Sequence, residues 1–262
     1  GAVPAPSTTT LAFGGTAGGN VANTEEFSVP PPTSKILVDG ETWYNVNAAN
    51  VKLSGTAAGV PATTWSSGGS LNHARYSGAG AGASNNSSMV FGGVPGPDNE
   101  TEIYDGSSWT EVNNLNTARA YLGGANAGTT TATLGFGGGS PYKANTESWN
   151  GTSWTEVNDM NTAREFVAGS GTQTAALGAG GYGPPPTTTS NKVEKWDGTA
   201  WTETTEINTA RSQASAVGEG YQSLLFAGDK HPASPRLANE TESWDGTSWT
   251  ELNNLNTARR LV

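Results

Sequence analysis

Two sets of oppositely charged residues recur along the chain at fixed spacing. In five places an arginine follows a tryptophan by ten positions, and these arginines are Arg75, Arg119, Arg164, Arg211 and Arg259. Five glutamates also recur at one position of the repeat, and they are Glu25, Glu102, Glu147, Glu194 and Glu242. Repeated guanidinium and carboxylate groups fit buried, charge-assisted pairs that hold a fold together. We expect such structural pairs, with a central ligand site as the alternative.

Other chemistry has little support in the sequence. Cysteine is absent, which excludes disulfides and thiolate metal sites. The two histidines are His73 and His231, and calcium-binding loops of the EF-hand type are missing. Paired carboxylates for glycoside hydrolysis cannot be assigned from spacing. We therefore expect no catalytic residue, no cofactor and no metal, and hence no enzyme.

The charge and hydropathy of the chain limit which kinds of partner it can have. The formal net charge is −10 over 262 residues, so the surface repels nucleic acid and anionic membranes. No stretch of about 18 apolar residues is present, so membrane insertion is not expected. Only 34% of the residues are hydrophobic, but nine are tryptophan. We expect an all-β protein with a core of aromatic side chains.

Each period contains four segments with strand character. In one period they are the ranges 120–126, 132–138, 145–149 and 153–157. The last two segments are joined by Asn-Gly, and Asp-Gly stands at that place in other periods: Asp105-Gly106, Asn150-Gly151, Asp197-Gly198 and Asp245-Gly246. These dipeptides favour tight antiparallel hairpins, because both central turn positions need positive φ.

Four strands repeated every 44 to 48 residues are typical of a β-propeller. We predict a single domain over residues 1–262 with about five four-stranded blades, whose periods end near residues 75, 119, 164, 211 and 259. The interval that runs from Arg259 through the chain ends to Arg75 spans 78 residues. We expect the N- and C-terminal strands to complete one split blade within this interval. Closure within one chain is favoured because it removes exposed sheet edges; completion of the next subunit's blade and a slice of a longer array are the alternatives.

The pattern resembles the kelch repeat. An arginine precedes the inner strand, a glycine pair closes the second strand, and aromatic residues mark the third and fourth. The glycine pairs are Gly14-Gly15, Gly92-Gly93, Gly137-Gly138 and Gly180-Gly181, with Ala227-Gly228 as a variant. The resemblance implies that each arginine pairs with a glutamate across neighbouring blades, and that the aromatic residues fill the space between blades.

The enlarged interval departs from the pattern. A Pro-rich linker and a β-hairpin are predicted within residues 28–62, inserted into one blade. The sequence Gly-Glu-Thr-Trp-Tyr-Asn with a following Val-Lys-Leu is similar to a short module of bacteriophage tail-fibre proteins. The arrays rich in Asn-Thr-Ala-Arg resemble those of large uncharacterised marine phage proteins. Trp43, Tyr44 and Lys52 of the hairpin are the candidate subunit contact.

The most variable segments are the loops between the second and third strands, and binding sites usually lie in such loops. The candidate binding residues are Pro95, Tyr142, Lys143, Tyr182, Lys230 and His231. We predict a non-enzymatic structural or receptor-contacting subunit of an extracellular filament or phage tail fibre, located outside the cell or on the virion surface. Its partners would be further copies of itself and a cell-surface glycan or receptor. A secreted carbohydrate-binding propeller is the alternative, and a glycoside-processing enzyme is a third, weaker one.

Overall fold

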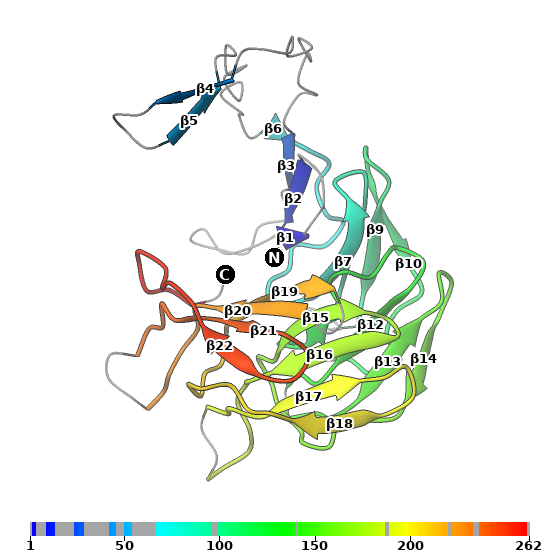
Figure 1. The fold of residues 1–262 in the computed structure, drawn as a ribbon. Coiled ribbons are helices and arrows are strands. Elements are labelled where there is room, and N and C mark those ends of the chain that lie inside the picture. Colours follow the sequence, from blue (N-terminus) through cyan, green and yellow to red (C-terminus); the bar gives the residue numbers. More distant parts are fainter. Residues whose placement is uncertain are drawn as a thin grey trace.

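The computed structural model describes most of the chain after residue 65. The described ranges are 66–95, 99–139, 141–186, 189–219, 222–232 and 236–260, together with strand backbone at 2–3, 9–13, 24–28, 42–45 and 50–53. All regular elements in these ranges are β-strands, and their arrangement around a common centre is that of a β-propeller (Figure 1). No helix within the described ranges reaches the length and hydropathy that a membrane crossing requires.

Four blades follow one another along the chain. The first contains β7 (Ala79–Ser84), β8 (Ser87–Phe91), β9 (Thr101–Tyr104) and β10 (Trp109–Val112). The second contains β11 (Gly123–Gly124), β12 (Thr133–Phe136), β13 (Thr146–Trp149) and β14 (Trp154–Val157). The third contains β15 (Ala168–Thr172), β16 (Ala175–Ala179), β17 (Val193–Trp196) and β18 (Trp201–Thr204). The fourth contains β19 (Ser215–Glu219), β20 (Gln222–Phe226), β21 (Thr241–Trp244) and β22 (Trp249–Glu251).

Each blade is an antiparallel meander whose strands pair in sequence order. The inner strands β7, β11, β15 and β19 lie next to one another around the centre. The third and fourth strands form the predicted hairpin, but not with positive φ at both central positions. Tyr104 pairs with Trp109 across a four-residue loop in which Gly106 alone has positive φ, at +96°. Asp105 Oδ1 accepts the backbone N–H groups of Ser107 and Ser108 at 2.8 and 2.9 Å. The corresponding turns at Asn150, Asp197 and Asp245 make the same two hydrogen bonds.

Tryptophan packs each blade against the one before it. The Trp154 ring lies 4.8 Å from that of Phe91 in the preceding blade, and its Nε1 donates to Thr101 Oγ1 at 3.0 Å. Trp201 repeats both contacts with Phe136 and Thr146. Three apolar clusters result, one at each interface between successive blades. The expected role of the aromatic residues between blades is thus confirmed for these interfaces.

The prediction of five blades is wrong for this structure, which has four. The strands β1 (Ala2–Val3), β2 (Thr9–Phe13), β3 (Thr24–Ser28) and β6 (Ser66–Ser67) form a further four-stranded antiparallel sheet, here called the N-terminal sheet. Its inner strands β1 and β2 lie beside β7, and Figure 1 shows β2, β3 and β6 rising away from the blades. Its outer strand β6 pairs through only two residues, before Gly68 and Gly69 weaken the strand. The sequence period gives the number of repeats. A repeat becomes a blade only when its sheet also packs face to face against the neighbouring sheets.

The split blade stays a prediction, because residues 1, 4–8 and 261–262 at the two chain ends lie outside the described residues. Ala2 and Val3 of β1 pair with Ala12 and Leu11 of β2, so the N-terminal sheet has its own inner strand. At the other end of the chain, Arg259 forms a bridge with Ala238 of the fourth blade.

The inserted hairpin does form, from β4 (Thr42–Asn45) and β5 (Asn50–Leu53), with Trp43 opposite Lys52. The side chains of Trp43, Tyr44 and Lys52, the Gly14-Gly15 pair and most of the 28–62 linker lie outside the described residues.

Candidate functional site

Four of the five predicted Arg–Glu pairs are present, and all four are buried. Arg119 Nη2 lies 3.0 Å from Glu147 Oε1, and neither side chain is exposed. The other three pairs are Arg75–Glu102, Arg164–Glu194 and Arg211–Glu242. The expectation that each pair links neighbouring blades needs correction. Each arginine lies on the crossing segment, and its glutamate belongs to the third strand of the blade that this segment enters.

The carboxylate of each pair is saturated by donors from the crossing segment. Glu147 Oε2 accepts the backbone and side-chain N–H groups of Asn116 at 2.7 and 2.9 Å, and Oε1 accepts the backbone N–H of Thr117 at 3.2 Å. Asn116 Nδ2 also donates to the Trp154 carbonyl at 3.0 Å. This explains why Asn-Thr-Ala-Arg recurs as a unit: its asparagine and arginine bind one buried carboxylate.

The guanidinium groups are used almost as fully. Arg164 Nη1 donates to the carbonyl of Lys192, at 2.9 Å, and to that of Gly180, while Nη2 donates to Glu194. Burial lowers the pKa of the Arg119, Arg164 and Arg211 guanidinium groups, and the facing glutamates oppose this shift. Only Nε of each of the four buried arginines lacks a partner. These four sets leave no charged group for a central ligand, so we assign them to stability.

The fifth predicted pair is described on the arginine side only. The side chain of Arg259 is exposed, and its described hydrogen bond goes to the Thr257 carbonyl at 3.3 Å. The side chain of Glu25 lies outside the described residues.

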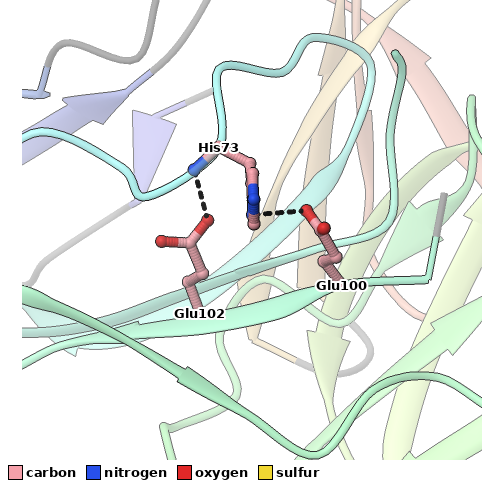
Figure 2. Close-up of side chains that lie close together, drawn as sticks. All are labelled: His73, Glu100 and Glu102. Atoms are coloured by element: carbon pink, nitrogen blue, oxygen red, sulfur yellow. Dashed lines mark hydrogen bonds and ion pairs between the residues drawn. The ribbon is translucent and has the colours of Figure 1, made fainter. Parts of the chain in front are cut away.

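One variant of the network brings together His73, Glu100 and Glu102, as Figure 2 shows. His73 occupies the position of the repeated threonine, and its Nδ1 lies 3.1 Å from Glu100 Oε2. A histidine with two carboxylates has the ligand types of a metal site. However, Arg75 Nη2 lies 2.9 Å from that same Glu100 oxygen and 2.5 Å from Glu102. The guanidinium already supplies the positive charge at this place, so the cluster does not fit a cation.

The rim around the propeller centre is formed by strained backbone with variable side chains. The residue two positions after each buried arginine has a left-handed backbone: φ is 57° at Ser77, 57° at Tyr121, 55° at Phe166 and 54° at Gln213. The backbone N–H of Tyr121 donates to Ser77, and that of Phe166 donates to Tyr121, at 2.8 and 2.7 Å. Such conformations are strained in residues other than glycine and are found preferentially at functional sites. The rim is therefore a rigid backbone frame whose side chains differ from blade to blade.

A cavity of about 250 Å³ opens between the third and fourth blades next to this rim. It is lined by Glu165, Phe166, Tyr182, Ser212, Gln213, Asp229, His231 and Arg236. We call this cavity the rim pocket. Two backbone bridges, Glu165 with Tyr182 and Ser212 with Asp229, fix its walls. The pocket therefore consists of the first two residues after two arginines and the loops that follow two glycine pairs.

The rim pocket combines an aromatic row with unpaired acceptors. The rings of Tyr142 and Tyr182 are 6.2 Å apart, and that of His231 follows at 6.5 Å from Tyr182, so the row crosses three blades. Gln213 Oε1 and His231 Nδ1 are buried without a hydrogen-bond partner among the described residues. A buried acceptor without a partner is costly. A ligand that presents an apolar face and several hydroxyl or amine donors would satisfy these groups.

The two carboxylates that line the pocket are in different electrostatic states. Burial raises the pKa of Glu165, for which the described residues provide no ion pair. Burial would also raise the pKa of Asp229, but hydrogen bonds from Arg236, Arg260 and the His231 N–H lower it overall. Asp229 is thus a structural anchor for the loop, and Glu165 is the group that remains available to a ligand.

The structure places the predicted binding residues unevenly. Tyr142, Tyr182 and His231 come together in the aromatic row. Lys230 lies nearby but pairs with Glu240 at 2.6 Å, Pro95 is exposed in the first blade, and Lys143 contributes backbone hydrogen bonds. Sequence reasoning missed Glu165, Gln213, Asp229 and Arg236. A usable signal existed, because the two positions after each repeated arginine vary while the Asn-Thr-Ala-Arg that precedes them is nearly constant.

Comparisons with known proteins do not extend this picture. No protein-family model matches the chain, and no curated protein matches it either.

Proposed function

We propose that the chain is a non-enzymatic, kelch-like propeller that acts as a structural and receptor-contacting subunit of an extracellular filament, most simply a phage tail fibre. One observation carries the receptor contact: the rim pocket collects single-copy loop residues on a scaffold that is otherwise repeated. Variable side chains on a rigid frame are the usual basis of recognition, and function is argued from that site because propellers host many functions.

The state of the pocket carboxylates supports a binding role over catalysis. Canonical glycoside hydrolysis uses two carboxylates in complementary roles. Both oxygens of Asp229 are engaged by Arg236, and Arg260 and the His231 N–H bind them as well. Glu165 is then left as a single carboxylate with no second member of a pair. The enzymatic alternative requires turnover of a sugar substrate that is abolished by Glu165→Gln.

The receptor contact is tested by binding of the purified chain to candidate host cells, compared between two variants. Tyr182→Ala removes the centre of the aromatic row and is expected to reduce binding about tenfold or more, as for other aromatic anchors. Asn86→Ala is the matched control, because Asn86 is exposed beside the Asp105-Gly106 turn at the other end of the blades. Equal binding by both variants and the parent chain would contradict the proposal.

A second candidate is a carbohydrate-binding propeller, and the aromatic row is the observation that favours it. Sugar rings stack on aromatic side chains and present hydroxyl donors, which matches Tyr182 and the unpaired acceptors of Gln213 and His231. A glycan array separates the two candidates. Selective binding that is lost in Tyr182→Ala supports the carbohydrate-binding module, whereas binding to cells with a silent array supports a protein receptor.

A further inference from the structure

The fourth blade has one face on which no other blade lies within the part of the chain that the structure describes. In the first three blades the corresponding face is covered by the next blade. Apolar residues at equivalent positions are buried there. Leu115, Met160 and Ile207 occupy one equivalent position there, and they are 1%, 4% and 2% exposed. Val112 and Val157 occupy a second position and pack against the interface clusters. These three interfaces define what the free face of the fourth blade should bind.

The free face carries the same apolar positions without their cover. Leu255 stands where Leu115 stands, and its backbone makes the same hydrogen bond, to Asn239 instead of Asn99, but its side chain is only partly buried. Leu252 stands where Val112 stands and is 43% exposed. It is one of two large hydrophobic side chains exposed in the described residues, the other being Leu237. The face is therefore apolar at the positions that normally contact a blade.

A polar position on this face is also left unpaired. Thr101 and Thr146 accept the indole N–H of Trp154 and Trp201 from the next blade. Thr241 is the equivalent residue of the fourth blade, and its hydroxyl is buried with no hydrogen-bond partner among the described residues. An indole donor from a further blade-like sheet would satisfy it.

Arg259 supplies the charge on this face. Its N–H donates to Ala238 and its carbonyl accepts from Gly228, both at 2.9 Å. Arg164 and Arg211 make equivalent backbone bonds, but their side chains are buried against glutamate. The backbone of Arg259 is thus already set for a buried pair, and no carboxylate among the described side chains binds it.

The N-terminal sheet has a glutamate at the equivalent register position. Glu25 in β3 is opposite Ala12 and Ser67. Glu147 in the second blade is opposite Gly135 and Glu156, which are the equivalent residues of the neighbouring strands. The N-terminal sheet therefore repeats the register of a blade, with Glu25 where an arginine from the preceding crossing segment would bind. In the sequence, Trp65 precedes β6 as Trp154 begins β14.

We propose that the free face of the fourth blade binds the N-terminal sheet of a second copy of this chain, with Arg259 of one copy paired to Glu25 of the next. A second copy is favoured because the N-terminal sheet of the same chain lies beside β7 and rises away from the blades (Figure 1). The two contact surfaces differ, so the interface is heterologous and repeats from copy to copy. This inference deepens the proposed filament role and rests on it.

Site-specific cross-linking tests the pairing directly, since the natural chain has no cysteine. A chain carrying Glu25→Cys and a differently tagged chain carrying Arg259→Cys are mixed and treated with a bismaleimide of about the length of an Arg–Glu pair. We expect a covalent dimer that contains both tags, and much less of it when Glu111→Cys, an exposed position in β10, replaces Glu25→Cys. If instead a chain with both cysteines cross-links only within itself and stays monomeric, the second-copy interface is wrong and the chain closes on its own sheet.

Sedimentation velocity over a concentration series provides the second measurement. The parent chain is expected to self-associate, and Leu252→Glu is expected to weaken association about tenfold or more, because a charge replaces a leucine that becomes buried. Leu237→Glu is the control, since Leu237 is similarly exposed, at 40%, but lies in a loop. Arg259→Glu should also weaken association, and Glu25→Arg should restore it in the double variant. A monomeric parent chain, or equal effects of both leucine changes, overturns the interface. Cell binding through Tyr182 is measured separately, so either proposal can fail alone.

Discussion

Buried polar and charged groups have different roles in the crossing segments and in the rim pocket. Around Glu147 both carboxylate oxygens are bound by Asn116, Thr117 and Arg119, and an asparagine and an arginine bind the equivalent glutamate in all four blades. In the pocket, Gln213 Oε1 and His231 Nδ1 have no hydrogen-bond partner among the described residues, and the described part of the other blades does not repeat this set of residues. Satisfied and repeated groups stabilise the fold, whereas unsatisfied and unique groups mark the place where a ligand can add stability.

The same backbone segment carries both the buried arginine and the rim residues that follow it. Arg75, Arg119 and Arg164 each donate to the carbonyl of the first glycine of a pair. The second residue after each buried arginine then has a left-handed backbone at the rim. The strain at Phe166 and Gln213 persists because the buried network next to it holds the chain in place. Stability in one region therefore allows side-chain variation in the other.

Removing one carboxylate from the repeated network is the strongest test of this comparison. Glu147→Gln leaves the buried Arg119 guanidinium without its counter-charge. We expect the free energy of unfolding to fall by about 3–5 kcal/mol, as for other broken buried pairs. Urea unfolding at neutral pH measures it, and the midpoint should fall with little change in slope.

The control for this substitution is Glu111→Gln, on the exposed strand directly opposite the glutamate of the first blade. Exposed substitutions of this kind usually change stability by about 0.5 kcal/mol or less. If Glu147→Gln were equally mild, the repeated pairs would not be the stabilising element.

The residues that recur in each repeat could be predicted from the sequence, and the pocket residues that occur once could not. Arg119, Glu147, Asp105-Gly106 and the glycine pairs each recur, so periodicity alone indicates a common structural role. Glu165 and Asp229 come from different blades and occur once in their context, so no spacing connects them. The blade count failed for a similar reason, because repetition predicts strand order but not whether the N-terminal sheet packs against its neighbours.

The next prediction concerns the contact between Trp154 and Thr101. A double-mutant cycle with Trp154→Phe and Thr101→Val isolates their hydrogen bond of 3.0 Å. We expect a coupling energy of about 0.5–1.5 kcal/mol from urea unfolding. The chain contains its own comparison at the interface between the third and fourth blades, because Val193 replaces the threonine there and Trp249 Nε1 donates to the Thr205 carbonyl instead. A cycle with Val193→Thr and Trp249→Phe should show weaker coupling, and equal coupling would contradict the assignment.

The smallest effect distinguishes the two carboxylates of the rim pocket by its sign. The pKa of Glu165 is raised above its ordinary 4.5, so its stabilising contribution is present at low pH and is lost as pH rises above that value. The pKa of Asp229 is lowered below its ordinary 3.8, so its contribution is present above that pH and is lost as pH falls below it. The difference in unfolding free energy between the parent chain and Glu165→Gln should therefore shrink with rising pH, and that for Asp229→Asn should shrink with falling pH. Urea unfolding at a series of pH values measures both slopes. Slopes of the same sign would show that the two carboxylates share one environment. They would contradict the assignment of Glu165 as the carboxylate that is available to a ligand.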